Sequence, residues 1–296
     1  MSEFLQQLLN GLSLGAIYAL IALGYTMVYG VLRFINFAHS DVFMVGAFIG
    51  YYLGKLVPEN TIWGGLVVLL VAMIGCALLG MLIEKLAYRP LRDAATLNVL
   101  ITAIGVSLLL EYSGQVFFGA TPRTFPAVFP SVNFNFGDLV ISSNQVVVIV
   151  VTALLMVGLQ FIVHRTKIGT AMRAVSLNPK AAQLVGINND VVISFTFGLG
   201  SALAAAGGIL YALNYPSIDP LMGVMPGLKA FVAAVLGGIG NIPGAALGGL
   251  LLGTVETFVN GSQWSTYKDA IAFAILIIIL LFRPAGLLGK SSIEKV

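Results

Sequence analysis

Charge is scarce in this chain. Only 9% of its 296 residues are charged, whereas 58% are hydrophobic. Soluble domains carry about 25% charged residues, so this composition excludes an ordinary water-soluble protein. The formal net charge of +3 is also too small to indicate a nucleic-acid partner. We therefore expect an integral membrane protein that is surrounded by lipid.

Cysteine and histidine are nearly absent as well. The single cysteine, Cys76, excludes an intramolecular disulfide, and the two histidines, His39 and His164, are too few and too separated to predict a metal site. Zinc-protease and nucleophile-elbow motifs do not occur. The stretch "GLLGKSS" is no phosphate-binding loop, because Pro284 stands where that motif needs a glycine. We expect no enzymatic activity and no cofactor or metal bound by this chain.

Long uncharged stretches predict helices that cross a bilayer, each of which needs about 20 apolar residues. Strand-like alternation at barrel spacing is missing, so helices are expected throughout. The predicted fold is an all-α polytopic membrane protein, a single transmembrane domain over residues 1–296 with about seven to nine crossing helices. The predicted spans are residues 11–32, 42–54, 62–83, 94–120, 139–163, 191–213, 230–255 and 270–282.

Basic residues between the spans predict the orientation. Most lysines and arginines lie in residues 84–93, in residues 164–180 and in the tail after residue 282. The positive-inside rule places such segments in the cytoplasm. Counting the spans then puts the N-terminus outside and the C-terminus in the cytoplasm.

The stretch "GNIPG" (residues 240–244) interrupts the predicted span 230–255. If that span crossed once, the basic tail would end outside, against the positive-inside rule. Each half is about 18 Å long, which is too short for a hydrocarbon core of about 30 Å. We therefore predict a broken or re-entrant glycine-rich element, with Asn241 and Pro243 near the middle of the membrane. One long helix kinked at Pro243 is the alternative.

Two pairs of segments share a pattern in which a small-residue helix precedes a short glycine-rich helix. The pairs are residues 11–30 with 35–54, and residues 197–215 with 236–253. Because the first helices run in opposite directions, we predict an inverted repeat of the kind that lines substrate pathways in transporters. Ordinary close packing on small residues is the alternative.

A short helix is predicted inside the basic loop of residues 164–190. Asn178 is a favoured N-cap, Pro179 a favoured first residue, and Gly186 can end the helix in a left-handed conformation. Two turns cannot span a membrane, so the apolar side chains suit a groove on another protein. A helix lying on lipid is the alternative. The apolar residues are Ala181, Ala182, Leu184 and Val185.

This loop resembles the coupling loop of ABC-importer permeases, specifically those of the branched-chain amino acid type. The stretches "YALIALGYTMVYGVLRFINFAHSD", "EKLAYRPLR", "GIGNIPGAALGGL" and "RPAGLLG" carry the resemblance further, over nearly the whole chain. The family pattern usually has glycine, and often glutamate next, where this chain has Ser40 and Asp41.

The resemblance implies a permease subunit in a bacterial inner membrane that imports branched-chain or other neutral amino acids. It implies three kinds of partner: a second permease subunit in a homo- or heterodimer, two ATPase subunits that hydrolyse ATP with magnesium, and a periplasmic or extracellular substrate-binding protein. A permease for urea or an amide, and a stand-alone ion-coupled carrier or channel, are the alternatives. The residues expected at the ATPase contact are Arg173, Asn178, Pro179, Ala181, Ala182, Leu184 and Gly186.

Polar residues in or near the spans are candidates for a pathway or gate. The stretch "INFAHSD" (residues 35–41) is expected at the cytoplasmic end of the second span. Ser40 or Asp41 could cap the short helix, Asn36 and His39 could stabilise a helix break that moves during transport, or the group could support the ATPase interface. Ionisable groups near span ends, such as Glu111 and Glu256, have interfacial solvation as the simpler explanation. The candidates are Asn36, His39, Asp41, Glu111, Asn241 and Pro243.

Overall fold

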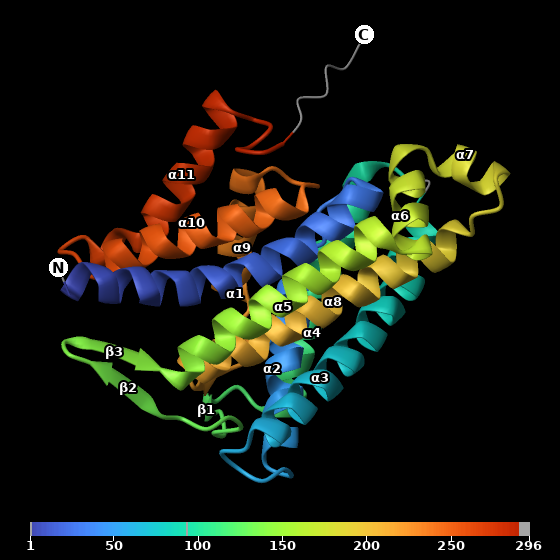
Figure 1. The fold of residues 1–296 in the computed structure, drawn as a ribbon. Helices are drawn as coiled ribbons and strands as arrows, with labels where there is room; N and C mark the ends of the chain where they lie inside the picture. Colours follow the sequence, from blue (N-terminus) through green and yellow to red (C-terminus); the bar gives the residue numbers. More distant parts are fainter. Residues whose placement is uncertain (1, 93, 290–296) are drawn as a thin grey trace.

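The computed structural model describes residues 2–92 and 94–289, which form a bundle of helices with two small antiparallel strand pairs (Figure 1). Within these residues, seven helices are long and apolar enough to cross a membrane. The predicted all-α polytopic membrane fold is confirmed. The long helices are α1 (Ser2–Leu32), α3 (Ile62–Ile83), α4 (Thr96–Phe118), α5 (Ser143–Arg165), α8 (Asn189–Asn214), α10 (Ile242–Asn260) and α11 (Lys268–Phe282).

Shorter elements connect the long helices. A π-helical turn and a 3-10 turn extend α3, and a further 3-10 turn precedes α11. The shorter helices are α2 (His39–Gly54), α6 (Lys167–Leu177), α7 (Pro179–Leu184) and α9 (Val224–Gly237). The turns are η1 (Glu84–Tyr88), η2 (Arg89–Leu91) and η3 (Ser265–Tyr267). The paired strands are β1 (Arg123–Thr124) with β4 (Ser217–Ile218) and β2 (Asn133–Phe136) with β3 (Leu139–Ser142).

The helix predicted to begin at Leu139 begins at Ser143 instead, because the preceding four residues form β3. The Ser142 hydroxyl accepts a hydrogen bond from the backbone N–H of Asn144, and Gln145 completes a capping box. This cap ends the strand and starts the helix at one point. The polar run of residues 142–145, with its Ser-x-x-Gln spacing before the apolar run, was the available sequence signal for this boundary.

The bundle has two distinct ends (Figure 1). We call the end that carries η1, η2, α6 and α7 the basic end, and the end that carries β2 and β3 the hairpin end. The N-terminus lies at the hairpin end, where the Gln6 side chain exchanges two hydrogen bonds of 3.0 Å with the backbone of Val140. Helices α1, α5 and α8 each run between the two ends.

Helices α1 and α10 form the centre of the bundle and pack against each other on small residues. Gly11 and Gly15 face the backbone of Thr254 and Leu250, and Gly249 faces Ala19. A Cβ atom on any of these glycines would overlap the opposite backbone. Such close approach gives dense packing without a hydrophobic driving force between helices. Helices α3, α4, α5 and α11 are mostly unburied and apolar, as lipid-facing helices are.

Helix α2 begins inside the bundle, whereas its start was expected at the membrane surface. His39 packs against Gly24 of α1, which lies eight residues, about 12 Å, before the end of α1 at Leu32. Ser40 packs against Gly223 and Gly227 at the start of α9. The expectation was wrong because the chain after α1 turns back into the bundle before α2 starts, and this return leaves no mark in the composition.

Two short helices therefore start beside each other in the interior, α2 after α1 and α9 after α8. Helices α1 and α8 are antiparallel, since Gly24 approaches Gly200 while Ile21 approaches Gly207. This arrangement has the form of an inverted repeat. The second short helix of the repeat is α9, however, one helix earlier than the residues 236–253 that the sequence pattern indicated.

The break at "GNIPG" separates two helices, so the single kinked helix is excluded. Gly238 and Gly240 have φ values of +106° and +90°, which helical residues do not adopt. Gly240 lies against Gly30 near the end of α1, at the basic end. The predicted position in the middle of the membrane was wrong, because α9 starts in the interior and α10 alone has 19 residues.

Candidate functional site: the coupling loop and the membrane pathway

Helix α7 has the local structure that its sequence predicts. The Asn178 side-chain oxygen accepts a hydrogen bond of 3.0 Å from the N–H of Ala181, and Pro179 is the first helical residue. Gly186 ends the segment with a φ of +85°. The Asn189 side chain donates to the Pro179 carbonyl at 2.9 Å. These contacts fix α7 against the start of α8 at the basic end (Figure 1).

Large apolar side chains project from the last residues of α6 and α7 and from the residue that follows α7. Leu177, Leu184 and Val185 are 82%, 89% and 76% exposed, and we call them the α7 apolar patch. Ala182 is only 3% exposed, and its carbonyl accepts a hydrogen bond from Ile187. Ala182 was expected at the ATPase contact, but it faces inward, so it supports the loop and does not contribute to the patch.

Arg173, also expected at the ATPase contact, is exposed and turns toward its own chain. Its guanidinium donates to the carbonyl of Val163 in the last turn of α5, and to the Thr170 hydroxyl at 3.3 Å. A cation at the C-terminal end of a helix interacts favourably with the helix dipole. Arg173 therefore fixes the angle between α5 and α6.

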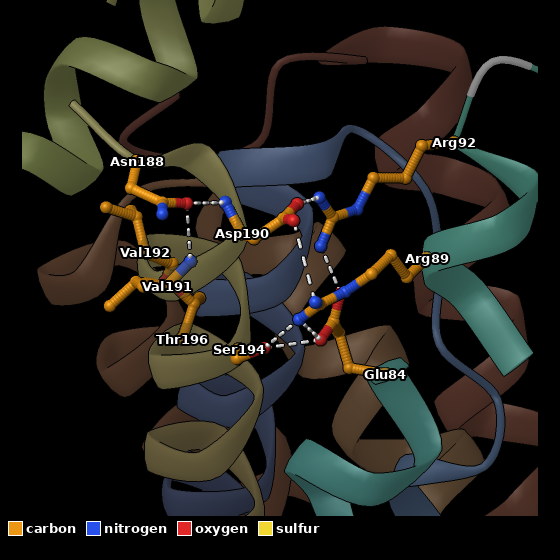
Figure 2. A network of polar contacts seen from close by, with 9 residues as sticks. All are labelled: Glu84, Arg89, Arg92, Asn188, Asp190, Val191, Val192, Ser194 and Thr196. Carbon is orange, nitrogen blue, oxygen red and sulfur yellow. Dashed lines mark hydrogen bonds and ion pairs between the residues drawn. The ribbon is translucent and has the colours of Figure 1, made fainter. Parts of the chain in front are cut away.

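A network of charged side chains lies between the end of α3 and the start of α8 (Figure 2). Its centre is Glu84, which is fully buried in the π-helical turn after α3. The Arg89 guanidinium donates to the Glu84 carboxylate at 3.0 Å and to the Ser194 hydroxyl at 2.8 Å. Arg92 forms a second ion pair with Glu84. The buried carboxylate is thus compensated by two guanidinium groups.

The same two arginines bind the first turn of α8. Arg92 pairs with Asp190, and Arg89 lies 3.5 Å from the other oxygen of that carboxylate. Asn188 caps α8 by accepting hydrogen bonds from the N–H groups of Asp190 and Val191, at 3.0 and 3.4 Å (Figure 2). The network therefore joins the end of α3 to the residues that follow α7. Sequence reasoning treated residues 84–93 only as a basic loop, because it had no means of pairing them with Asp190.

The polar stretch after α1 has buried partners. The Tyr88 hydroxyl donates to the Asn36 side-chain oxygen at 2.6 Å. His39 is 1% exposed and packs on the ring of Tyr25, with 4.8 Å between ring centroids. Helix capping by Ser40 or Asp41 was wrong: Ala38 is the N-cap residue, and the Ser40 hydroxyl donates to the Phe37 carbonyl at 2.9 Å.

Asp41 is 1% exposed, so it does not lie at a solvated interface. Its carboxylate accepts a hydrogen bond of 2.5 Å from the Ser107 hydroxyl on α4. Glu111 lies one turn further along the same face of α4 and is half-buried. These residues lie in the part of the bundle where α2 begins, whereas Asn241 and Pro243 lie at the basic end. The pathway candidates therefore do not form one cluster, and their role stays a hypothesis.

A cavity of about 930 Å³ lies at the hairpin end, between α1, α5, α8, α9, α10 and α11. Lys229 on α9 lies in its wall, with its ammonium nitrogen 2.6 Å from an oxygen of Glu256 and 2.6 Å from an oxygen of Asp269. The Tyr18 hydroxyl donates to the other Glu256 oxygen at 2.9 Å. Sequence reasoning missed Lys229, because the predicted span began at the next residue. The available signal was that Lys229 is the one charged residue between Asp219 and Glu256.

The part of the chain that the structure describes contains no group of three histidine, cysteine or acidic side chains placed to hold a metal ion. The described chain has an exposed apolar patch at the basic end and a charged cavity at the hairpin end. Such a pair of features suits a protein that passes a solute and receives force from a partner.

Comparison with known proteins agrees with this architecture. The family model described as "branched-chain amino acid transport system / permease component" matches residues 7–280. The chain belongs to this permease family. The permease is 44% identical to the high-affinity branched-chain amino acid transport system permease protein BraD of Pseudomonas aeruginosa, over 99% of this chain and 98% of that protein.

Two further relatives cover most of the permease. LivH of Escherichia coli, named as a high-affinity branched-chain amino acid transport system permease protein, is 41% identical over 99% of this chain and 98% of its own length. LivH of Methanocaldococcus jannaschii, a probable branched-chain amino acid transport permease protein, is 31% identical over 91% of this chain and 88% of its own. The resemblance found in the motifs is confirmed.

Proposed function

We propose that this permease is the transmembrane subunit of an ABC importer that carries branched-chain or other neutral amino acids into a bacterial cell. The family and the names of its relatives support the substrate class. The basic end faces the cytoplasm by the positive-inside rule, which places the N-terminus outside and the C-terminus inside.

The observation that carries the coupling role is the α7 apolar patch. Three large apolar side chains are exposed at the basic end, on a segment that is fixed from both sides. An apolar helical face of this kind fits a groove on a partner protein. In our proposal the partner is one of two ATPase subunits, which hydrolyse ATP with magnesium. A second permease subunit and an external substrate-binding protein complete the importer.

Force on α7 reaches the membrane part by two routes. Asn189 connects α7 directly to α8, and the Glu84 network connects the start of α8 to the end of α3. Asp190 is 50% exposed, but Glu84 is fully buried and also accepts a hydrogen bond from Ser194 of α8. This buried group holds a fixed geometry because separation leaves an unpaired charge. A push on the patch therefore moves α3 and α8 together.

A Leu184→Asp variant tests the proposal. We expect ATP-driven leucine uptake to fall at least about tenfold, because the loss of a buried anchor at an interface weakens association by about 2 kcal/mol or more. Leu184 is 89% exposed, so the amount of permease in the membrane should not change. Uptake is measured in vesicles that contain the assembled importer, and co-purification of the ATPase is measured in parallel.

Leu56→Asp is the matched control. Leu56 is 81% exposed and follows α2 at the other end of the bundle, so the same substitution there should leave uptake and ATPase binding unchanged. Normal uptake in Leu184→Asp, or uptake by the permease alone without ATP, would contradict the proposal and favour a stand-alone carrier.

A further inference from the structure

The cavity at the hairpin end contains an unusual charge cluster for a membrane protein. Lys229 and Glu256 have side chains that are only 6% and 8% exposed, whereas Asp269, at the start of α11, is 42% exposed. Intramembrane charges are energetically costly and mark substrate pathways more often than they support packing. The cluster thus sits in the wall of a cavity that is large enough for a small solute.

The charges around the cavity balance. Lys229 and Lys268 carry two positive charges, and Glu256 and Asp269 carry two negative charges. The Lys229 ammonium has three N–H donors, and two carboxylate oxygens occupy two of them. One N–H therefore remains for an anionic group, while the exposed Asp269 carboxylate offers an oxygen to a cationic group.

Apolar groups lie next to these charges. Met225 and Pro226 come four and three residues before Lys229, so they share its face of α9. Both line the cavity, as does Leu14 of α1. The wall therefore combines an ammonium and apolar groups within about one turn of α9 with the carboxylates of Glu256 on α10 and Asp269 on α11.

We propose that this cavity binds the zwitterionic backbone of the transported amino acid. The substrate α-ammonium binds the carboxylates of Asp269 and Glu256, and the α-carboxylate accepts the third N–H of Lys229. The aliphatic side chain packs against Met225 and Leu14. The inference rests on the proposed function, which supplies a neutral amino acid as the solute. It adds the contacts that distinguish an amino acid from an amine or a carboxylic acid.

The test uses a cysteine placed in the cavity. Met225→Cys is made in a Cys76→Ser background, in the assembled importer, and its reaction with a membrane-impermeant maleimide is timed. L-leucine at about ten times its Kd should slow labelling about tenfold by mass action. Isoamylamine, which lacks the carboxylate, and 4-methylpentanoate, which lacks the ammonium, should protect far less. Asn260→Cys, which also lines the cavity, replaces Met225→Cys if the latter is not assembled.

Asp269→Asn separates ligand binding from a structural role. The variant keeps the shape of the side chain and leaves Lys229 paired with Glu256, so we expect the importer to assemble. Removal of one carboxylate leaves the cavity wall with one net positive charge. Protection by leucine should then be lost, while protection by 4-methylpentanoate increases. A purely structural ion pair would not change the order of the ligands in this way.

Other outcomes would overturn the inference. Equal protection by isoamylamine and leucine would identify a cation site, and no protection by leucine would show that the cluster only joins α9, α10 and α11. In either case, leucine uptake that still needs ATP and is still abolished by Leu184→Asp would leave the proposed function standing. If the unmutated importer showed no ATP-driven amino-acid uptake at all, the proposed function would be refuted instead.

Discussion

Gly249→Leu is expected to remove nearly all folded permease from the membrane. Even the Cβ atom of the new side chain would overlap the backbone nitrogen and Cα of Ala19 in α1, and backbone atoms cannot move aside as a flexible side chain can. Overpacking of a dense core costs about 1–3 kcal/mol or more. Here it would separate α1 from α10, the two helices at the centre of the bundle. Two quantities are measured: the amount of permease in the membrane, and the fraction of it that stays monodisperse after extraction into detergent.

Gly158→Leu is the matched control for this substitution. Gly158 lies on α5, where a Cβ atom would meet no other atom within 4 Å. Both variants replace a helical glycine with the same residue, so they share any gain in helix propensity. A folded Gly249→Leu permease at normal level would show that α1 and α10 can separate without loss of the fold.

The double variant Arg89→Met/Arg92→Met is expected to lose about 3–5 kcal/mol of stability, since removal of the partners leaves the buried Glu84 carboxylate uncompensated. Glu84 is fully buried, and its one remaining hydrogen-bond partner in the described chain would be the Ser194 hydroxyl. Thermal unfolding of the purified permease measures the loss. Leucine uptake should fall with it, because the ion pairs that join the end of α3 to Asp190 of α8 are lost and only the Ser194–Glu84 hydrogen bond remains.

The triple variant with Glu84→Met added should recover most of this stability. Replacement of a whole buried ion-pair group by apolar residues of similar size is often neutral or stabilising. Asp190 is 50% exposed and keeps access to water. If the triple variant were stable but still transported poorly, the network would serve coupling more than folding. If the double variant were as stable as the unmutated permease, the expected cost of leaving the buried Glu84 carboxylate unpaired would be contradicted.

The helix α7 was predictable because its signals are local. Asn178, Pro179 and Gly186 act within the segment that they cap, and no distant residue is needed to place them. The spans were predictable for a similar reason, since an uncharged run long enough to cross a bilayer has few other structures available. The burial of Ala182 depends on which face of α7 meets α8. The local sequence does not contain that information.

The interior start of α2 and the Lys229 cluster could not be predicted in this way. The cluster joins residues from α1, α9, α10 and α11, so its partners are separated by tens to hundreds of positions in the chain. The start of α2 depends on contact between Ser40 and glycines near residue 225. Both features follow from the way the two halves of the chain meet, which composition and spacing along the chain do not determine.

Because α9 starts in the interior, it crosses only part of the bundle. Along α9, Lys229 is eight residues from Gly237, where the helix ends, which is about 12 Å, against a hydrocarbon thickness of about 30 Å. The far end of α9 is held by hydrogen bonds from the backbone of Leu287 and Leu288. A tilt of this short helix alone would therefore suffice to open a path from the cavity to the basic end.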